Sequence, residues 1–278
     1  HQMATVSLKS DKTGGAGTLR YYDADALTLA TAGGAGSSLA GPAGTAASTV
    51  AATTTGAKTV AGAANGAIVI RAGNGAAGAL TVNEAINTTS TTADTAGGTV
   101  VLESRGNLEL ASNGTITTTG NGAAAGGEVY LHNIATTAGT ITLGTGITAK
   151  GGATNDAASD GAVVTVFNEN GAIAVNSTID VSKGAALGAD GAIQLQATGD
   201  ITDGASGRLT GNTEGKLLAY STGGSVTLDL TAGHQMATVS LQSDKTGAPG
   251  TLTYYDADGL TVATAGGVGT LLAVSGSN

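Results

Sequence analysis

The sequence predicts an all-β protein, a parallel β-solenoid (β-helix) with about 30 residues per coil and about eight coils per 233-residue repeat. Three observations lead to this prediction: short segments of alternating apolar residues, their recurrence after glycines, and an unusual composition. The chain of 278 residues holds 47 Gly, one Phe and no Trp. A core centred on large aromatic side chains is therefore excluded, whereas the narrow core of a solenoid takes Ala, Val, Ile, Leu and Thr.

Alternating apolar segments are the strand candidates. The clearest cases begin at glycines spaced 26 to 34 residues apart and cover residues 66–70, 98–102, 127–131, 161–166, 191–195, 224–228 and 250–254. A second series falls between them, at residues 78–82, 106–110, 139–143 and 171–175. Alternation over four to six residues, bounded by Gly, Asn, Asp and Ser, is typical of strands. Each coil is therefore expected to carry at least two strands.

Coil length sets the dimensions of the rod. We interpret the 49 residues between Gly17 and Gly66 as two shorter coils, which gives eight coils per repeat. At about 4.8 Å per stacked strand, one repeat is expected to be about 38 Å long. Surplus residues at 87–96, 121–126 and 151–161 are predicted to form loops on one edge.

A long repeat sets the domain organisation. Residues 1–40 and 234–273 match at 31 of 40 positions, an offset of 233 residues. We therefore expect residues 1–233 to be one full repeat and residues 234–278 to begin the next as a copy of residues 1–45, with no separate globular domain.

Charge and cysteine content exclude several function classes. The formal net charge is −9, and the 11 Lys and Arg are scattered, which argues against nucleic acid. No apolar run approaches the roughly 20 residues of a membrane-spanning helix, so membrane insertion is not expected. The absence of Cys excludes disulfides and thiol chemistry.

Four stretches carry a family resemblance: GNLELASNGTITTTG (106–120), GTITLGTGITAKG (139–151), GAIAVNSTIDVSKG (171–184) and GAIQLQATGDITDG (191–204). In these the chain resembles the repeat region of filamentous-haemagglutinin-type exoproteins and related giant bacterial adhesins. The resemblance implies a secreted β-helical rod at the bacterial cell surface, acting in adhesion or as a fibre. The amino-terminal secretion domain of that family, with its Asn-Pro-Asn-Gly type motif, is not seen in this sequence.

The segment Tyr-Tyr-Asp-Ala-Asp occurs in both copies and supplies the candidate metal ligands Asp23, Asp25, Asp256 and Asp258. Two carboxylates at i and i+2 of a strand face the same side and are able to chelate Ca²⁺ or to act as an acid/base pair. No other carboxylate cluster lies nearby, so a solvated acidic edge is the favoured interpretation. No cofactor is expected, and Ca²⁺ is the one ion considered.

The tyrosines of the same segment, Tyr21, Tyr22, Tyr254 and Tyr255, are candidates for an interface because tyrosine combines a large area with a polar tip. The alternative is that they cap a coil, with one ring inside and one outside.

Catalysis is not expected. Enzymes built on β-helices use paired carboxylates with Arg or Lys and aromatic platforms for sugars, but this chain has four Arg and no Trp. The three histidines, His1, His132 and His234, are dispersed, and we interpret them as surface or turn residues.

These observations favour a non-catalytic structural segment of a secreted, tandem-repeat extracellular fibre or adhesin. The expected partners are copies of the chain, end to end and laterally, with cell-surface glycans as further candidates. The alternative is a module that binds carbohydrate, ice or Ca²⁺ from the same solenoid, since ranks of threonine on a flat face resemble ice-binding surfaces.

Overall fold

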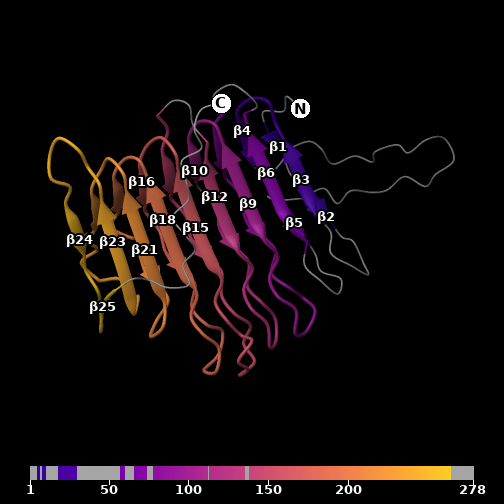
Figure 1. Cartoon of the computed structure of the whole chain (residues 1–278). Helices are drawn as coiled ribbons and strands as arrows, with labels where there is room; N and C mark the ends of the chain where they lie inside the picture. Colours follow the sequence, from indigo (N-terminus) through magenta and orange to yellow (C-terminus); the bar gives the residue numbers. More distant parts are fainter. Residues whose placement is uncertain are drawn as a thin grey trace.

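The protein is a parallel β-solenoid. The computed structural model describes residues 5–6, 8–10, 18–29, 57–59, 66–73, 78–111, 113–134 and 138–263, in which there are 25 strands and no helix. The strands form three parallel sheets that run side by side along the molecule (Figure 1). The predicted fold class is confirmed.

Each coil contributes one strand to each sheet over most of the length. Sheet A consists of β1 (Thr5–Val6), β4 (Leu27–Leu29), β7 (Leu80–Val82), β10 (Leu108–Leu110), β13 (Ile141–Leu143), β16 (Ile173–Val175), β19 (Ile201–Asp203), β22 (Val226–Leu228) and β24 (Leu252–Tyr254). Sheet B consists of β2 (Leu8–Ser10), β5 (Ala57–Thr59), β8 (Ile86–Asn87), β11 (Ile116–Thr117), β14 (Ile147–Thr148), β17 (Ile179–Asp180) and β20 (Leu209–Thr210). Sheet C consists of β3 (Leu19–Tyr22), β6 (Ile68–Ala72), β9 (Val100–Ser104), β12 (Val129–Asn133), β15 (Val163–Asn168), β18 (Ala192–Ala197), β21 (Lys216–Ser221), β23 (Thr238–Ser243) and β25 (Thr261–Val262).

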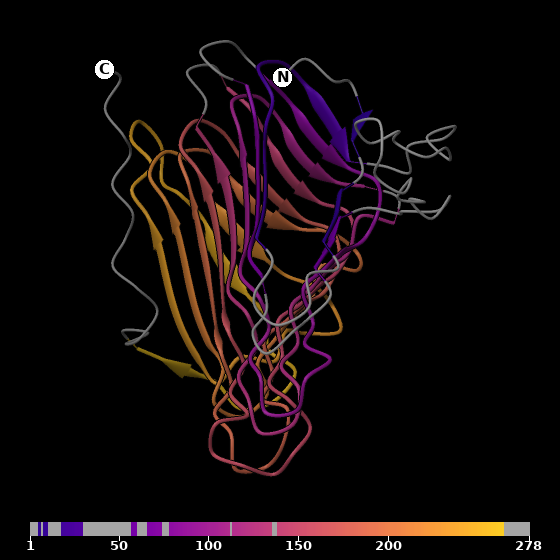
Figure 2. The same ribbon diagram turned by 90° about the vertical axis from the view of Figure 1, so that its right-hand side faces the viewer.

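The chain passes from sheet C to sheet A, then to sheet B, and back to sheet C one level further along. Figure 2 looks along the stack and shows the coils superposed as a wedge, with loops gathered at its narrow lower end. The long connections lead from sheet B back to sheet C and cover residues 88–99, 118–128 and 149–162. The predicted loops therefore lie on one edge.

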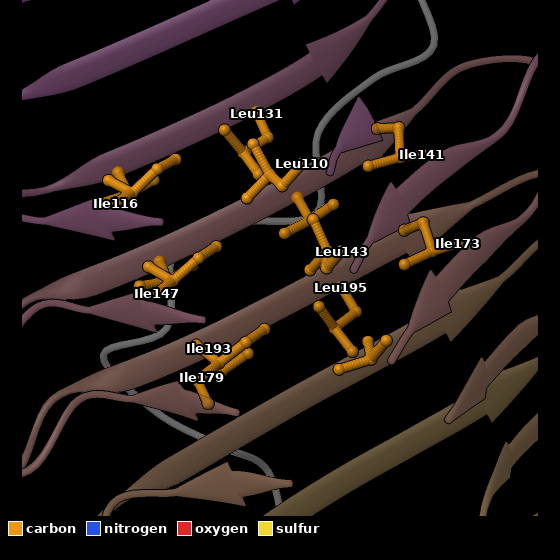
Figure 3. Close-up of a cluster of buried hydrophobic side chains, with 14 of the residues drawn as sticks. Leu110, Ile116, Leu131, Ile141, Leu143, Ile147, Ile173, Ile179, Ile193 and Leu195 are labelled. Carbon is orange, nitrogen blue, oxygen red and sulfur yellow. The ribbon is translucent and has the colours of Figure 1, made fainter. Parts of the chain in front are cut away.

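The core is built from columns of aliphatic side chains. In sheet B, Ile86, Ile116, Ile147, Ile179 and Leu209 follow one another in register, and each is at most 1% exposed. Figure 3 shows such side chains stacked between the sheets. Burying one of these side chains contributes about 1.5 to 3 kcal/mol, so stability is distributed along the rod rather than concentrated at one centre.

Tight corners require glycine. Gly171 has φ of +146°, and a Cβ on it would lie 1.8 Å from the carbonyl oxygen of Gly139, one coil below. Any larger residue would push the two coils apart at this corner.

Polar side chains in the turns tie each coil to the next. Asp94 Oδ1 accepts a hydrogen bond from the Ala123 amide at 2.7 Å, and Asp160 Oδ1 accepts one from the Ala189 amide at 2.7 Å. In both cases the carboxylate belongs to one coil and the amide to the following coil. These bonds satisfy amides that lie outside the strand ladders.

Two details of the coil assignment are wrong. Strand β3 pairs directly with β6 and β4 with β7, so the Gly17 to Gly66 wrap is one coil instead of two. The alternating segments at 224–228 and 250–254 belong to β22 and β24 of sheet A, whereas the segment at 191–195 belongs to β18 of sheet C. The glycine spacing therefore counted two coils between residues 191 and 250, where the chain makes two coils and a third of another. As a result, Thr5 and Thr238 are separated by seven full turns and two thirds of another, slightly fewer than the eight coils predicted.

Candidate functional sites

The Tyr-Tyr-Asp-Ala-Asp segment of the first copy forms a closed polar turn between β3 and β4. The Tyr21 hydroxyl donates to Asp23 Oδ2 at 2.9 Å, and the Asp25 amide donates to Asp23 Oδ1 at 3.1 Å. Asp23 is only 2% exposed, whereas Asp25 is exposed. Burial, followed by the hydrogen bond to the Asp23 carboxylate, raises the pKa of Tyr21 to about 12.

The second copy repeats this turn after β24. The Tyr254 hydroxyl donates to Asp256 Oδ2 at 2.9 Å, and the Asp258 amide donates to Asp256 Oδ1 at 3.1 Å. Burial first, and then the hydrogen bond to Asp256, raise the pKa of Tyr254. The hydrogen bond with Asp256 also raises the pKa of Asp258.

This geometry differs from the expected pair of carboxylates on one strand face. Asp23 is turned inward and its two oxygens are engaged by Tyr21 and the Asp25 amide, so it is neither an open ligand nor part of a solvated edge. Among the described residues, no group of three His, Asp or Glu side chains is arranged to hold a metal ion. The arrangement closes a turn; the observed contacts give it no further chemistry.

The tyrosine pairs divide between the inside and the outside. Tyr21 and Tyr254 pack against the core. Tyr22 and Tyr255 are 46% and 54% exposed. The Arg71 guanidinium lies 5.3 Å from the centre of the Tyr22 ring, a cation–π contact on the outer face of sheet C. Only Tyr22 and Tyr255 are therefore placed to contact another molecule.

His234 occupies a core position, which the sequence interpretation missed. It is fully buried, and its Nδ1 accepts a hydrogen bond from the Leu209 amide at 3.1 Å. Its Nε2 lies 3.1 Å from Asp203 Oδ2 but off the line of a good hydrogen bond, and its ring stacks on Tyr254 at 5.1 Å. Desolvation by burial dominates the attraction of Asp203 and lowers the pKa of His234.

A second cluster lies on the outer face of sheet C. His132 Nε2 lies 2.9 Å from Glu169 Oε1, and its ring stacks on Phe167 at 5.0 Å. Glu103 forms an ion pair with Arg71, and its Oε1 lies 4.0 Å from His132 Nδ1. The neighbouring His132, and then Arg71, lower the pKa of Glu103 against the opposing effect of burial. Arg71 and Glu103 carry opposite charges at paired positions of neighbouring strands, as expected for a structural ladder. Neither His132 nor His234 is a simple surface residue; His1 lies outside the described residues.

Sheet A presents a rank of threonines on its outer face. One outward position in successive strands is occupied by Thr28, Thr81, Glu109, Thr142, Ala174, Thr202, Thr227 and Thr253. The spacing is that of the strands, about 4.8 Å. The rank is regular, but Glu109 and Ala174 interrupt it.

A shallow hollow of about 570 Å³ opens beside the corner after β19, lined by Asp203, Asp229 and the neighbouring loop residues. The Asp203 carboxylate already accepts hydrogen bonds from the Asp229 and Leu230 amides at 3.1 and 2.8 Å. One of the two carboxylates that line the hollow is therefore already bound by backbone amides of the protein.

Comparisons with known proteins give no relative. No protein-family model matches the chain, and neither a curated protein nor a solved structure matches it. Within the described ranges, no helix is long and apolar enough to span a bilayer.

Proposed function

We propose that the chain is a non-catalytic structural segment of a secreted, tandem-repeat extracellular fibre or adhesin at the bacterial cell surface. One observation carries the proposal: two of the three parallel sheets continue without interruption through nine strands each, and among the described residues their first and last strands pair on one side only. Hydrogen bonds between stacked strands run along the axis and make such a rod stiff, and the number of tandem repeats sets its length.

Self-association tests this function. Because open strand edges invite pairing with another chain, sedimentation should show species that grow with protein concentration. A clean monomer at the highest concentrations would contradict the proposal.

Lateral contact between rods is a separate part of the proposal. It is assigned to the outward rings Tyr22 and Tyr255, since aromatic side chains with a polar tip favour interfaces. Replacing both with Ser should reduce bundling seen by electron microscopy, while the inward control Tyr21→Phe should not. Unchanged bundling in the double variant would reject these residues as the contact.

The second candidate function is a binding module, supported by the threonine rank of sheet A. Its ligand class is carbohydrate or ice, since aligned hydroxyls at strand spacing present repeated donors and acceptors. A glycan array and an ice-recrystallisation assay, each repeated with Thr142→Lys and Thr227→Lys, test it. A signal that these substitutions abolish would favour the module over the fibre, and no signal would leave the fibre as the better account.

A further inference from the structure

The strand edge formed by β24 and β25 leaves apolar side chains uncovered. Leu252, Leu260 and Val262 are 48%, 38% and 78% exposed. In sheet C, Val262 pairs with Val239, which is only 1% exposed. Within the part of the chain that the structure describes, Val262 is therefore the last member of this column of inward side chains, at one end of the solenoid (Figure 1).

The first copy of the repeat shows what these residues do when a coil lies above them. Leu27 and Leu29, the equivalents of Leu260 and Val262, are 1% and 0% exposed. Strand β7 covers them, with Leu27 paired to Leu80 and Leu29 to Val82. The equivalent positions in the first copy are thus buried by one more parallel strand with apolar inward residues.

The opposite end of the solenoid offers strands of this kind. In the described residues β1 is the first strand of sheet A and β3 the first of sheet C. Val6 and Leu19 pack against the core from these strands, and they pair with Leu29 and Ile68 of the next coil. Among the strands that the structure describes, none pairs with the outer edge of β1 or β3.

We propose that the β24 and β25 edge binds the β1 and β3 edge of a second copy of this chain, head to tail and with parallel strands. Continuing the columns in register places the second copy's Val6 on Tyr254 and its Leu19 on Val262. In the same register, Thr5 of the second copy pairs with Thr253. The interface repeats the coil-to-coil contact already present within the chain, and it specifies the self-association on which the proposed function depends.

The polarity of this contact has a structural consequence. A head-to-tail interface joins different surfaces, so each added copy exposes a new binding edge and the assembly grows as an open filament. A tail-to-tail contact would instead make the strands antiparallel and stop at dimers.

Disulfide trapping tests the register, because the chain has no cysteine of its own. Neighbouring strands lie about 4.8 Å apart, within the roughly 4.4 to 6.8 Å between Cα atoms that a disulfide spans. Under mild oxidation, Thr5→Cys/Thr253→Cys should give a ladder of linked oligomers. The control Thr28→Cys/Thr227→Cys places thiols in the same rank but away from both edges, and should give only slow, random cross-links.

A second variant tests the interface without cross-linking. Val262→Asp places a charge on the exposed edge and should weaken association at least tenfold by sedimentation. The control Leu187→Asp alters a loop residue that is 64% exposed and should change nothing.

Three other outcomes overturn the proposal in distinguishable ways. Association without the Thr5–Thr253 cross-link would reject this register while leaving the fibre intact. Efficient dimers of Thr253→Cys alone would show tail-to-tail contact and reject the polarity. No association of the unmodified chain would reject this interface and the proposed self-association together.

Discussion

The two copies of the repeat place nearly the same sequence in different parts of the solenoid. In the first copy, Thr5 pairs with Thr28 within sheet A. In the second, the equivalent Thr238 pairs with Thr261 within sheet C. Each copy closes a coil in 23 residues with the same register, yet on a different side of the wedge. Local sequence therefore sets how the coil closes, while the chain between the copies sets where around the axis it begins.

The polar turn also keeps its local structure in both copies while joining different sheets. The hydrogen bonds of Tyr21 and Asp25 to Asp23 recur, with equal lengths, between Tyr254, Asp258 and Asp256. The first turn leads from sheet C to sheet A, whereas the second follows a strand of sheet A. The turn is thus a self-contained unit that does not depend on which sheets it joins.

Burial is where the copies differ. Leu29 is fully buried beneath the next coil, while its equivalent Val262 is 78% exposed. The contribution of an apolar residue to stability therefore depends on whether a further coil covers it.

The largest effect is expected from truncating the buried member of this pair. Leu29→Ala should lower the free energy of unfolding by about 2 to 5 kcal/mol, since it leaves a cavity in a packed column. Val262→Ala should change the free energy of unfolding by about 0.5 kcal/mol or less, because the side chain of Val262 is exposed. Urea titration at low protein concentration, where association is minimal, measures both; equal losses would mean that the column is not the source of stability.

The next effect is acid sensitivity of the second copy. Because the pKa of His234 is lowered in the folded state from 6.5, the unfolded chain binds the proton more readily. Stability should therefore fall as pH decreases below about 6.5, by no more than about 1.4 kcal/mol per pH unit, until the folded pKa is reached.

The contribution of His234 to this pH dependence is measured by comparing the free energy of unfolding of the wild type and of His234→Leu between pH 7 and pH 5. The substitution continues the aliphatic column of Leu209 and should flatten the acid slope, whereas His132→Gln should leave the His234 contribution in place. An unchanged slope in His234→Leu would show that other groups cause the acid sensitivity.

The smallest effect concerns the polar turn and should be the same in both copies. Tyr21→Phe and Tyr254→Phe each remove one hydrogen bond to a carboxylate. Each substitution should lower the free energy of unfolding by about 1 to 2 kcal/mol. Asp23→Asn should also bring the pKa of Tyr21 down from about 12, measured by absorbance titration of tyrosinate. A cost confined to one copy would mean that the turn depends on its place in the solenoid.

Much of the fold could be predicted from the sequence because period-two alternation marks strands of sheets A and C and their inward residues. Sheet B was missed, since strands such as Ile86–Asn87 and Ile116–Thr117 hold two residues and leave no periodic signal. The change from sheet C to sheet A within the glycine series was missed in part because β23 follows Ala237 instead of a glycine.

The sites were less predictable than the fold. The contact between Tyr21 and Asp23 is local in sequence, but the inward orientation of the Asp23 side chain depends on the turn that follows β3. The burial of His234 depends on Asp203 and Leu209, 31 and 25 residues away, which only the stacking of coils brings together. A signal was present in the sequence, because this histidine belongs to the repeated His-Gln-Met motif.

The most direct test of the central claim, that one solenoid continues from copy to copy, is electron cryomicroscopy of the concentrated protein. We predict filaments whose strands run across the axis at about 4.8 Å spacing and whose parallel sheets continue from one copy to the next. Discrete short particles that do not lengthen with concentration would contradict it.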